Sequence, residues 1–156
     1  MSRYKDHSER LYEQVKGYAD RVFLMIGNNS KKEHKRIREQ MQETSPEETL
    51  ALVATGSLIG EGFDFPRLDT LIMATPVSFQ SVVEQYAGRL NRDYAGKKNV
   101  IVYDYVDAHI PMFDKMYLKR LKAYRQIGYE LCSGLHGEKQ DAGSIFDGEN
   151  YRDVFK

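Results

Sequence analysis

The sequence of 156 residues has no tryptophan, only four prolines and a single cysteine, Cys132. One cysteine excludes an intramolecular disulfide framework and is compatible with a reducing compartment. Lysine plus arginine and aspartate plus glutamate number 23 each, so no global basic field attracts nucleic acid and any such binding must use a local patch. No apolar run approaches transmembrane length, and the first residues do not form a signal peptide. We therefore expect a soluble, cytoplasmic protein without a membrane partner.

Metal ligands at the usual spacing are also lacking. The four histidines lie far apart in the sequence, without the paired spacing of a zinc site. We therefore predict no metal bound directly by this chain.

What is present is a regular alternation of helical and strand patterns. Apolar residues at helical spacing predict helices over 6–19, 30–42 and 111–128, and a further helix begins near Ser78. Pairs of polar residues predict N-terminal caps at 6–9 and at 30–33. Short apolar runs predict buried strands at 22–26, 50–55, 70–75 and 99–105. This order predicts an α/β fold, an open and mostly parallel sheet with helices on both faces.

The domain limits follow from the same pattern. The first predicted helix has no strand before it, which suggests that a first strand lies outside this sequence, and residues 1–131 are then one lobe. After Leu131 the composition changes to glycine, serine and charged residues, which predicts a linker or tail over 132–156. The apolar residues near the end suit either the start of a following domain or a tail that folds back.

A group of polar residues at 85–92 stands out. If this stretch is helical, Gln85, Arg89 and Arg92 lie on one face. Two guanidinium groups and an amide on one face are suited to binding phosphate oxygens, because arginine stays charged and donates in a fixed fork. The alternative is an ordinary solvated helix face.

A second polar segment, at 54–66, directly follows a predicted strand. It should therefore lie at the carboxyl end of the sheet, where open α/β folds bind ligands. Gly56, Gly60 and Gly62 allow close approach of the backbone, and Asp64 offers an acceptor suited to a sugar hydroxyl. The alternative is a tight turn that needs glycine for its geometry alone.

Together the two segments resemble motifs V and VI of the superfamily 2 helicases and translocases. The matching residues are Thr55-Gly56 through Gly62-Phe63-Asp64, then Gln85-x-x-Gly88-Arg89-x-x-Arg92. Gly-Glu-Gly-Phe-Asp at 60–64 looks most like the branch that contains restriction translocases and DEAD/DEAH proteins, and residues 3–11 are similar to motif IV. The resemblance covers residues 3 to about 128. It implies the C-terminal RecA-like lobe of an ATP-hydrolysing, nucleic-acid-binding helicase, with DNA preferred over RNA.

The resemblance also implies roles for single residues. Arg89 and Arg92 would be arginine fingers, with Arg92 on the γ-phosphate. Asp64 would reach the ribose or hold the fingers. The remaining ATP contacts would come from Gly60, Glu61, Gly62 and Gln85, and the nucleic-acid contacts from Thr55, Gly56, Tyr4 and Lys5. ATP and Mg²⁺ would bind in the full-length protein, between this lobe and its N-terminal RecA-like lobe.

The chain departs from a complete motor. It has no Gly-x-x-x-x-Gly-Lys-Ser/Thr loop for phosphates and no Asp-Glu pair after a strand for magnesium. We therefore expect the isolated chain to be inactive as an ATPase. One alternative is a degenerate, non-catalytic lobe that binds nucleic acid or protein. Another is an unrelated doubly wound nucleotide- or sugar-binding domain, which would need a phosphate loop near its first strand.

Two further groups have ordinary structural explanations. The basic residues at 31–38 suit a solvated helix face better than a strand-binding patch. Asp104 and Asp107, at the end of the last predicted strand, suit either a carboxylate pair or a helix cap.

Overall fold

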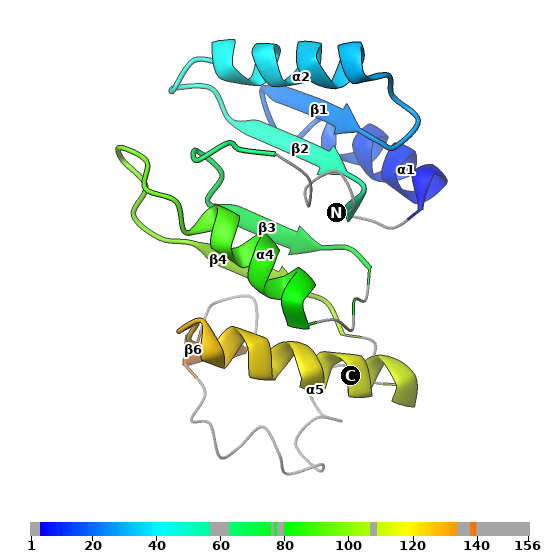
Figure 1. Ribbon diagram of the computed structural model, residues 1–156, viewed down its shortest axis with the longest axis vertical. Coiled ribbons are helices and arrows are strands. Elements are labelled where there is room, and N and C mark those ends of the chain that lie inside the picture. The colour runs from blue at the N-terminus through cyan, green and yellow to red at the C-terminus, as the bar shows by residue number, and fades with distance from the viewer. Residues whose placement is uncertain are drawn as a thin grey trace.

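The computed structural model describes residues 4–56, 63–75, 77, 80–106, 109–133 and 138–139. Helices and strands alternate along the chain, so the predicted α/β class is confirmed (Figure 1). The helices are α1 (Lys5–Val15), α2 (Lys31–Glu43), α4 (Gln80–Leu90) and α5 (Pro111–Gln126). The strands are β1 (Arg21–Met25), β2 (Leu50–Ala54), β3 (Thr70–Met73), β4 (Ile101–Asp104), β5 (Cys132–Ser133) and β6 (Glu138–Lys139). In the ranges that the structure describes, none of these helices is long and apolar enough to cross a membrane.

The predicted parallel sheet is divided into two pairs of strands. β1 pairs in parallel with β2, from Arg21 opposite Leu50 onward, and β3 pairs in parallel with β4, from Thr70 opposite Ile101 onward. All four strands point the same way in Figure 1, but no ladder joins β2 to β3 among the described residues. The short strands β5 and β6 form an antiparallel pair inside the segment predicted as a linker.

The helix ends show which sequence signals determine them. Ser30 caps α2 as predicted, because its hydroxyl accepts a hydrogen bond from the backbone N–H of Glu33 at 3.2 Å. The predicted cap at 6–9 is wrong, since α1 already begins at Lys5 and Ser8 is buried, donating its hydroxyl to the Tyr4 carbonyl at 3.0 Å. This helix also stops at Val15, short of the predicted end, with the poor helix former Gly17 in the following turn.

Each strand pair has its own core. The core beside β1 and β2 contains Met25, Ile37, Met41, Ala54 and Phe63. The core beside β3 and β4 contains Met73, Val77, Val83, Tyr86, Ala123 and Tyr124. α2 covers the first pair, whereas α4 and α5 pack on each other beside the second.

The prediction that strand 70–75 is buried on both faces is wrong for β3. Leu71 and Met73 pack toward the helices, but the alternate residue Ile72 is exposed, as are Ile101 and Tyr103 on the neighbouring β4. Successive side chains of a strand point to opposite faces. The described helices therefore cover one face of this pair and leave an apolar strip on the other.

A buried ion pair fixes α5 to the end of β4. Arg120, only 1% exposed, donates through Nε and Nη2 to the Asp104 carboxylate at 2.6 and 2.9 Å. Its Nη1 donates to the Val77 carbonyl at 2.8 Å, and the Tyr124 hydroxyl donates to Asp104 at 3.0 Å. Asp104 thus has an arginine as its partner, and Asp107 lies outside the described residues.

Candidate functional site

The two polar segments singled out in the sequence contact each other in the structure. Residues 86, 89 and 92 are spaced by three, and they contact residues 56, 63 and 64, respectively. The Tyr86 hydroxyl donates to the Gly56 carbonyl at 2.9 Å, Arg89 donates to the Phe63 carbonyl, and Arg92 forms an ion pair with Asp64. The last turns of α4 and the residue Arg92 after it are therefore bound to described residues on either side of 57–62.

Arg92 is the more exposed of the two arginines. Its side chain is 44% exposed and that of Asp64 is 55% exposed, so this ion pair lies at the surface. The Asp64 carboxylate is the partner of the Arg92 Nη1 group, and nearly half of the Arg92 side chain is open to solvent. Asp64 thus lies at ion-pair distance from Arg92.

Arg89 lies deeper than Arg92. Its side chain is partly buried and donates to the backbone carbonyl of Phe63, whose own ring is in the core beside β2. One turn earlier on the helix, Gln85 is exposed. Arg92 is thus the more exposed cation, whereas Arg89 is bound to a backbone carbonyl.

The position of this site in the fold differs in part from the expectation. Thr55 and Gly56 directly follow β2 and lie at its carboxyl end, as predicted. Asp64 does not, because α4 runs back from the carboxyl end of β3 and brings Arg92 toward the amino ends of β3 and β4 (Figure 1). Thr55 and Gly56 therefore lie at the carboxyl end of the β1–β2 pair, whereas Asp64 lies near the amino ends of β3 and β4.

Lys97 holds the end of α4 in place and was not identified from the sequence. Its ammonium group donates to the carbonyls of Leu90 and Pro66 at 2.6 Å and of Arg92 at 3.0 Å. A cation that binds the last carbonyls of a helix stabilises that end. Burial lowers the pKa of Lys97. The only sequence signal is a lysine shortly after a helix, next to Gly96 with its positive φ of 88°.

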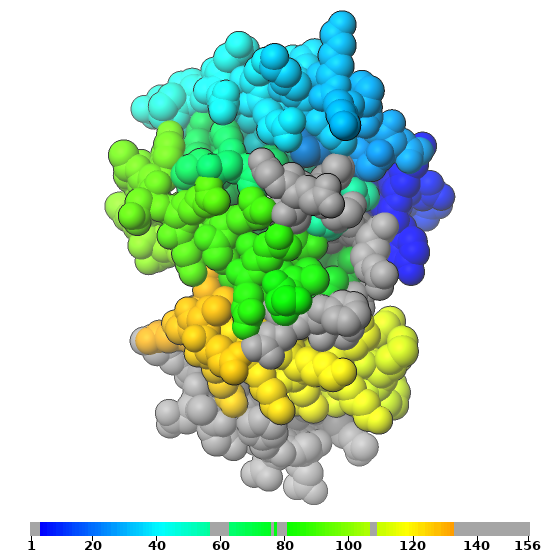
Figure 2. All heavy atoms as spheres, in the orientation of Figure 1, coloured from blue at the N-terminus to red at the C-terminus, as the bar shows by residue number. Residues whose placement is uncertain are grey.

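The loop after α4 borders an open hollow of about 610 Å³ beside Arg92. Tyr94 and Lys98 are among the residues that line it. Figure 2 shows that α4 and this loop form part of the molecular surface between α2 and α5. Arg92 is itself one of the residues that line this hollow.

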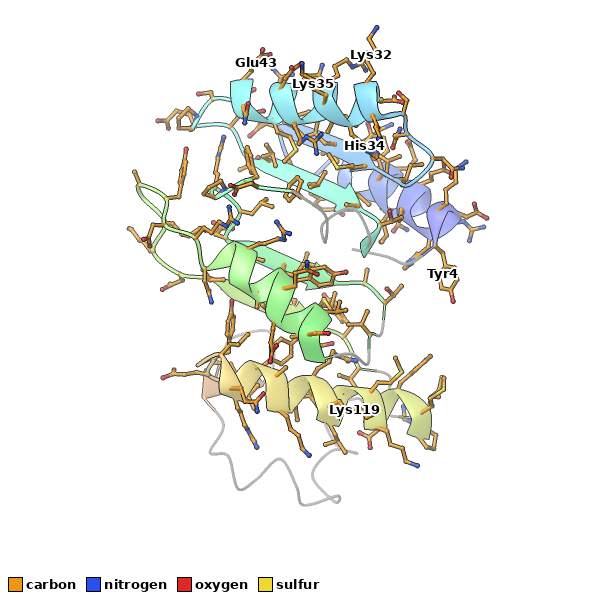
Figure 3. All side chains as sticks on the ribbon, in the orientation of Figure 1. Tyr4, Lys32, His34, Lys35, Glu43 and Lys119 are labelled. Carbon is orange, nitrogen blue, oxygen red and sulfur yellow. The ribbon has the colours of Figure 1, made fainter. Side chains whose placement is uncertain are left out.

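The residues predicted to contact nucleic acid lie in two places. Thr55 is buried at the end of β2, where its backbone N–H donates to the Met25 carbonyl at 3.1 Å. Tyr4 and Lys5 lie at the start of α1, where Tyr4 is exposed (Figure 3) and Lys5 pairs with Glu9 at 3.7 Å. Gly60, Glu61 and Gly62 lie outside the described residues.

The basic helix has the character of a solvated face. Lys32 and Lys35 point outward from α2 in Figure 3, and Lys35 pairs with Glu39 at 3.7 Å. His34 instead approaches the Ile26 carbonyl, with its Nε2 at 3.0 Å from the oxygen. Among the residues that the structure describes, no three histidine, cysteine or acidic side chains gather closely enough to bind a metal ion.

Sequence comparison shows which known proteins this chain is similar to. No family model matches the sequence. The chain is 39% identical over 77 residues to putative helicase 161L of Invertebrate iridescent virus 6 and 32% identical over 85 residues to probable helicase D10 of Escherichia phage T5. These matches cover 49% and 54% of this chain but only 16% and 18% of the two proteins. The chain is therefore related, over about half its length, to a small part of proteins named helicases.

A shorter relative matches over most of its own length. Uncharacterized protein 108L of Invertebrate iridescent virus 3 is 39% identical over 92 residues, which are 58% of this chain and 82% of that protein. The chain belongs to the family of protein 108L, and this family is related to helicases.

Proposed function

We propose that this chain is the C-terminal RecA-like lobe of an ATP-dependent helicase or translocase. In this proposal Arg92, assisted by Arg89, acts on an ATP molecule held between this lobe and an N-terminal lobe. The observation that carries the proposal is the exposed guanidinium of Arg92, held by Asp64 at the end of the motif-bearing helix. The relatives named helicases support the same proposal.

The chemistry of phosphate transfer explains why such an arginine is useful. Negative charge spreads over the phosphate oxygens in the transition state, so catalysis depends mainly on positioning and electrostatic stabilisation. An arginine that arrives with a second lobe makes hydrolysis depend on closure of the two lobes. The ion pair with Asp64 restricts the rotamers of Arg92 before closure. We assign further ATP contacts to Gly60, Glu61, Gly62 and Gln85.

In this proposal the N-terminal lobe binds Mg²⁺ and the phosphate chain, because this sequence has neither a phosphate loop nor an acidic magnesium motif. When bound there, Mg²⁺ would neutralise charge on the phosphates. The residues of this chain contribute the cation at the opposite side of the nucleotide.

A nucleic-acid contact is assigned to the carboxyl end of β2. Thr55, which is buried, and Gly56 lie there, and Tyr4 and Lys5 at the start of α1 extend the proposed surface. DNA is the preferred substrate, because the helicase branch that the motifs resemble acts mostly on DNA.

The proposal can be tested in a chimera. The matching segment of putative helicase 161L is replaced by this chain, and ATP hydrolysis is measured with and without single-stranded DNA or RNA. We expect Arg92→Ala to lower the stimulated kcat by about 10³-fold and to leave ATP binding largely intact. Stimulation by DNA above that by RNA would support the DNA preference.

Arg21→Ala is the matched control. Arg21 also forms an exposed ion pair, with Glu48 at 3.1 Å, but it lies on β1 away from the site. Exposed pairs contribute about 0–1 kcal/mol to folding, so both variants should fold alike and only Arg92→Ala should lose turnover. Unchanged turnover in Arg92→Ala, or an inactive parent chimera, would contradict the proposal.

A further inference from the structure

Tyr86 makes a contact that crosses between the two halves of the molecule. Its ring is 5% exposed and packs in the core beside β3 and β4, with Val83 and Tyr124. Its hydroxyl donates to the Gly56 carbonyl at 2.9 Å, and Gly56 follows the strand of the other half. Burial raises the pKa of Tyr86, so the hydroxyl remains a donor at neutral pH.

The other end of this contact is also fixed in position. Thr55, the residue before Gly56, donates its backbone N–H to the Met25 carbonyl of β1 at 3.1 Å. The Gly56 carbonyl therefore directly follows the hydrogen-bonded end of the β1–β2 pair. A ligand that displaces this strand end must move or break the hydrogen bond to Tyr86.

Tyr86 and Arg89 lie on α4, and Arg92 lies two residues beyond its end at Leu90. Arg89 follows Tyr86 by three residues, which corresponds to roughly 4.5 Å along the helical axis. Because a helix is stiff and this one is packed on α5, a shift at Tyr86 is transmitted to its C-terminal end. The same helix therefore receives a contact from the strand end, carries Arg89, and leads directly into Arg92.

We propose that Tyr86 is a positioning residue that couples binding of a nucleic-acid phosphate at Thr55 and Gly56 to the position of Arg89 and Arg92. This inference rests on the proposed function and adds to it the route between the two sites. If the hydroxyl only stabilised the fold, the response of the arginines to nucleic acid would be the same with and without it. A coupling hydroxyl makes their response depend on Tyr86.

Tyr129 provides a matched control. Its hydroxyl donates to the Asn91 Oδ1 at 3.0 Å, close to the same arginines, and its ring packs against the same core. Its hydroxyl bonds within the half that contains β3 and β4, so Tyr129→Phe removes a comparable hydroxyl while the hydrogen bond from Tyr86 to Gly56 is retained.

The experiment uses the chain itself and a fifteen-nucleotide oligothymidine. Affinity is measured by fluorescence anisotropy, and the Nε–Hε resonances of Arg89 and Arg92 are followed by NMR during the titration. We expect the oligonucleotide to shift the Arg92 resonance in the parent chain and in Tyr129→Phe. In Tyr86→Phe the affinity should change by less than about threefold, while the Arg92 shift falls to less than half. Tyr86→Met repeats the test with a different side chain that lacks the hydroxyl.

The outcomes separate the two proposals. A full Arg92 shift in Tyr86→Phe and Tyr86→Met, with binding retained, would overturn the coupling role alone. An equal loss in Tyr129→Phe would also overturn it, because the effect would then not depend on Gly56. Absence of oligonucleotide binding by the parent chain would overturn both this inference and the nucleic-acid part of the proposed function.

Discussion

Removal of the Arg120 guanidinium should destabilise the fold more than removal of any exposed cation. Arg120→Met keeps most of the side-chain volume and removes the charge. Asp104, 11% exposed, then loses its cation and keeps the hydrogen bond from the Tyr124 hydroxyl, and the Val77 carbonyl loses the Arg120 donor. A carboxylate without its cation in a nearly buried position is unfavourable.

The expected magnitude follows from this geometry. Removing one partner of a buried ion pair costs about 3–5 kcal/mol, because the other charge remains desolvated. The exposed pair of Arg21 with Glu48 should contribute no more than about 1 kcal/mol. Typical domains have a free energy of unfolding of about 5–15 kcal/mol, so Arg120→Met should remove a large part of it.

Urea unfolding followed by far-ultraviolet circular dichroism measures this difference, with Arg21→Met as the control. The double variant Arg120→Met/Asp104→Leu adds a second measurement. It removes both charges, so we expect it to be more stable than Arg120→Met alone. Comparison of Arg120→Met, Arg21→Met and the double variant separates two effects. One is the loss of the contacts of Arg120, and the other is the cost of leaving the Asp104 carboxylate unpaired.

Two results would refute the reasoning. The first is a loss in Arg120→Met no larger than that in Arg21→Met. The second is a double variant as unstable as the single one, which would mean that packing around residue 120 matters and the charge of Asp104 does not.

Two other predictions concern the half that contains β1 and β2. The side-chain hydroxyl and then the backbone N–H of Thr49 hold the pKa of Asp20 below its ordinary value, so the stabilisation is present at neutral pH and is lost as the pH falls through the lowered pKa. Thr49→Val should raise the Asp20 pKa part of the way in an NMR titration, and an unchanged value would contradict the assignment. Ser30→Ala should cost about 1 kcal/mol by loss of the α2 cap, seen as a lower melting temperature, and Ser30→Asp should retain most of the stability.

The sequence predicted the elements whose signals are local. The Ser30 cap, the start of α5 at Pro111 and the order of strands and helices all depend on neighbouring residues, and the structure has them. The two motif-like segments were also expected to act together. In the structure the two segments contact each other through the ion pair of Arg92 with Asp64, while the roles predicted for these residues stay predictions.

The features that were missed depend on pairing between distant residues. Tyr86 and Gly56 are 30 residues apart, and Arg120 and Asp104 are 16 apart. In the sequence, Arg120 is one of several cations on a long helix, and nothing local marks it as the buried one. Lys97 was missed for the same reason, since its three carbonyl partners come together only when α4 packs beside residue 66. Division of the sheet into two pairs likewise results from packing of whole elements.

The uncovered strip on β3 and β4 has a practical consequence for solution work. Parallel strands are usually covered on both faces. Here Ile72, Ile101 and Tyr103 are exposed to solvent on one face. Concentrated samples of this polypeptide should therefore be prone to self-association and aggregation. Dilute samples, checked by light scattering across a dilution series, are the appropriate starting material for every titration described above.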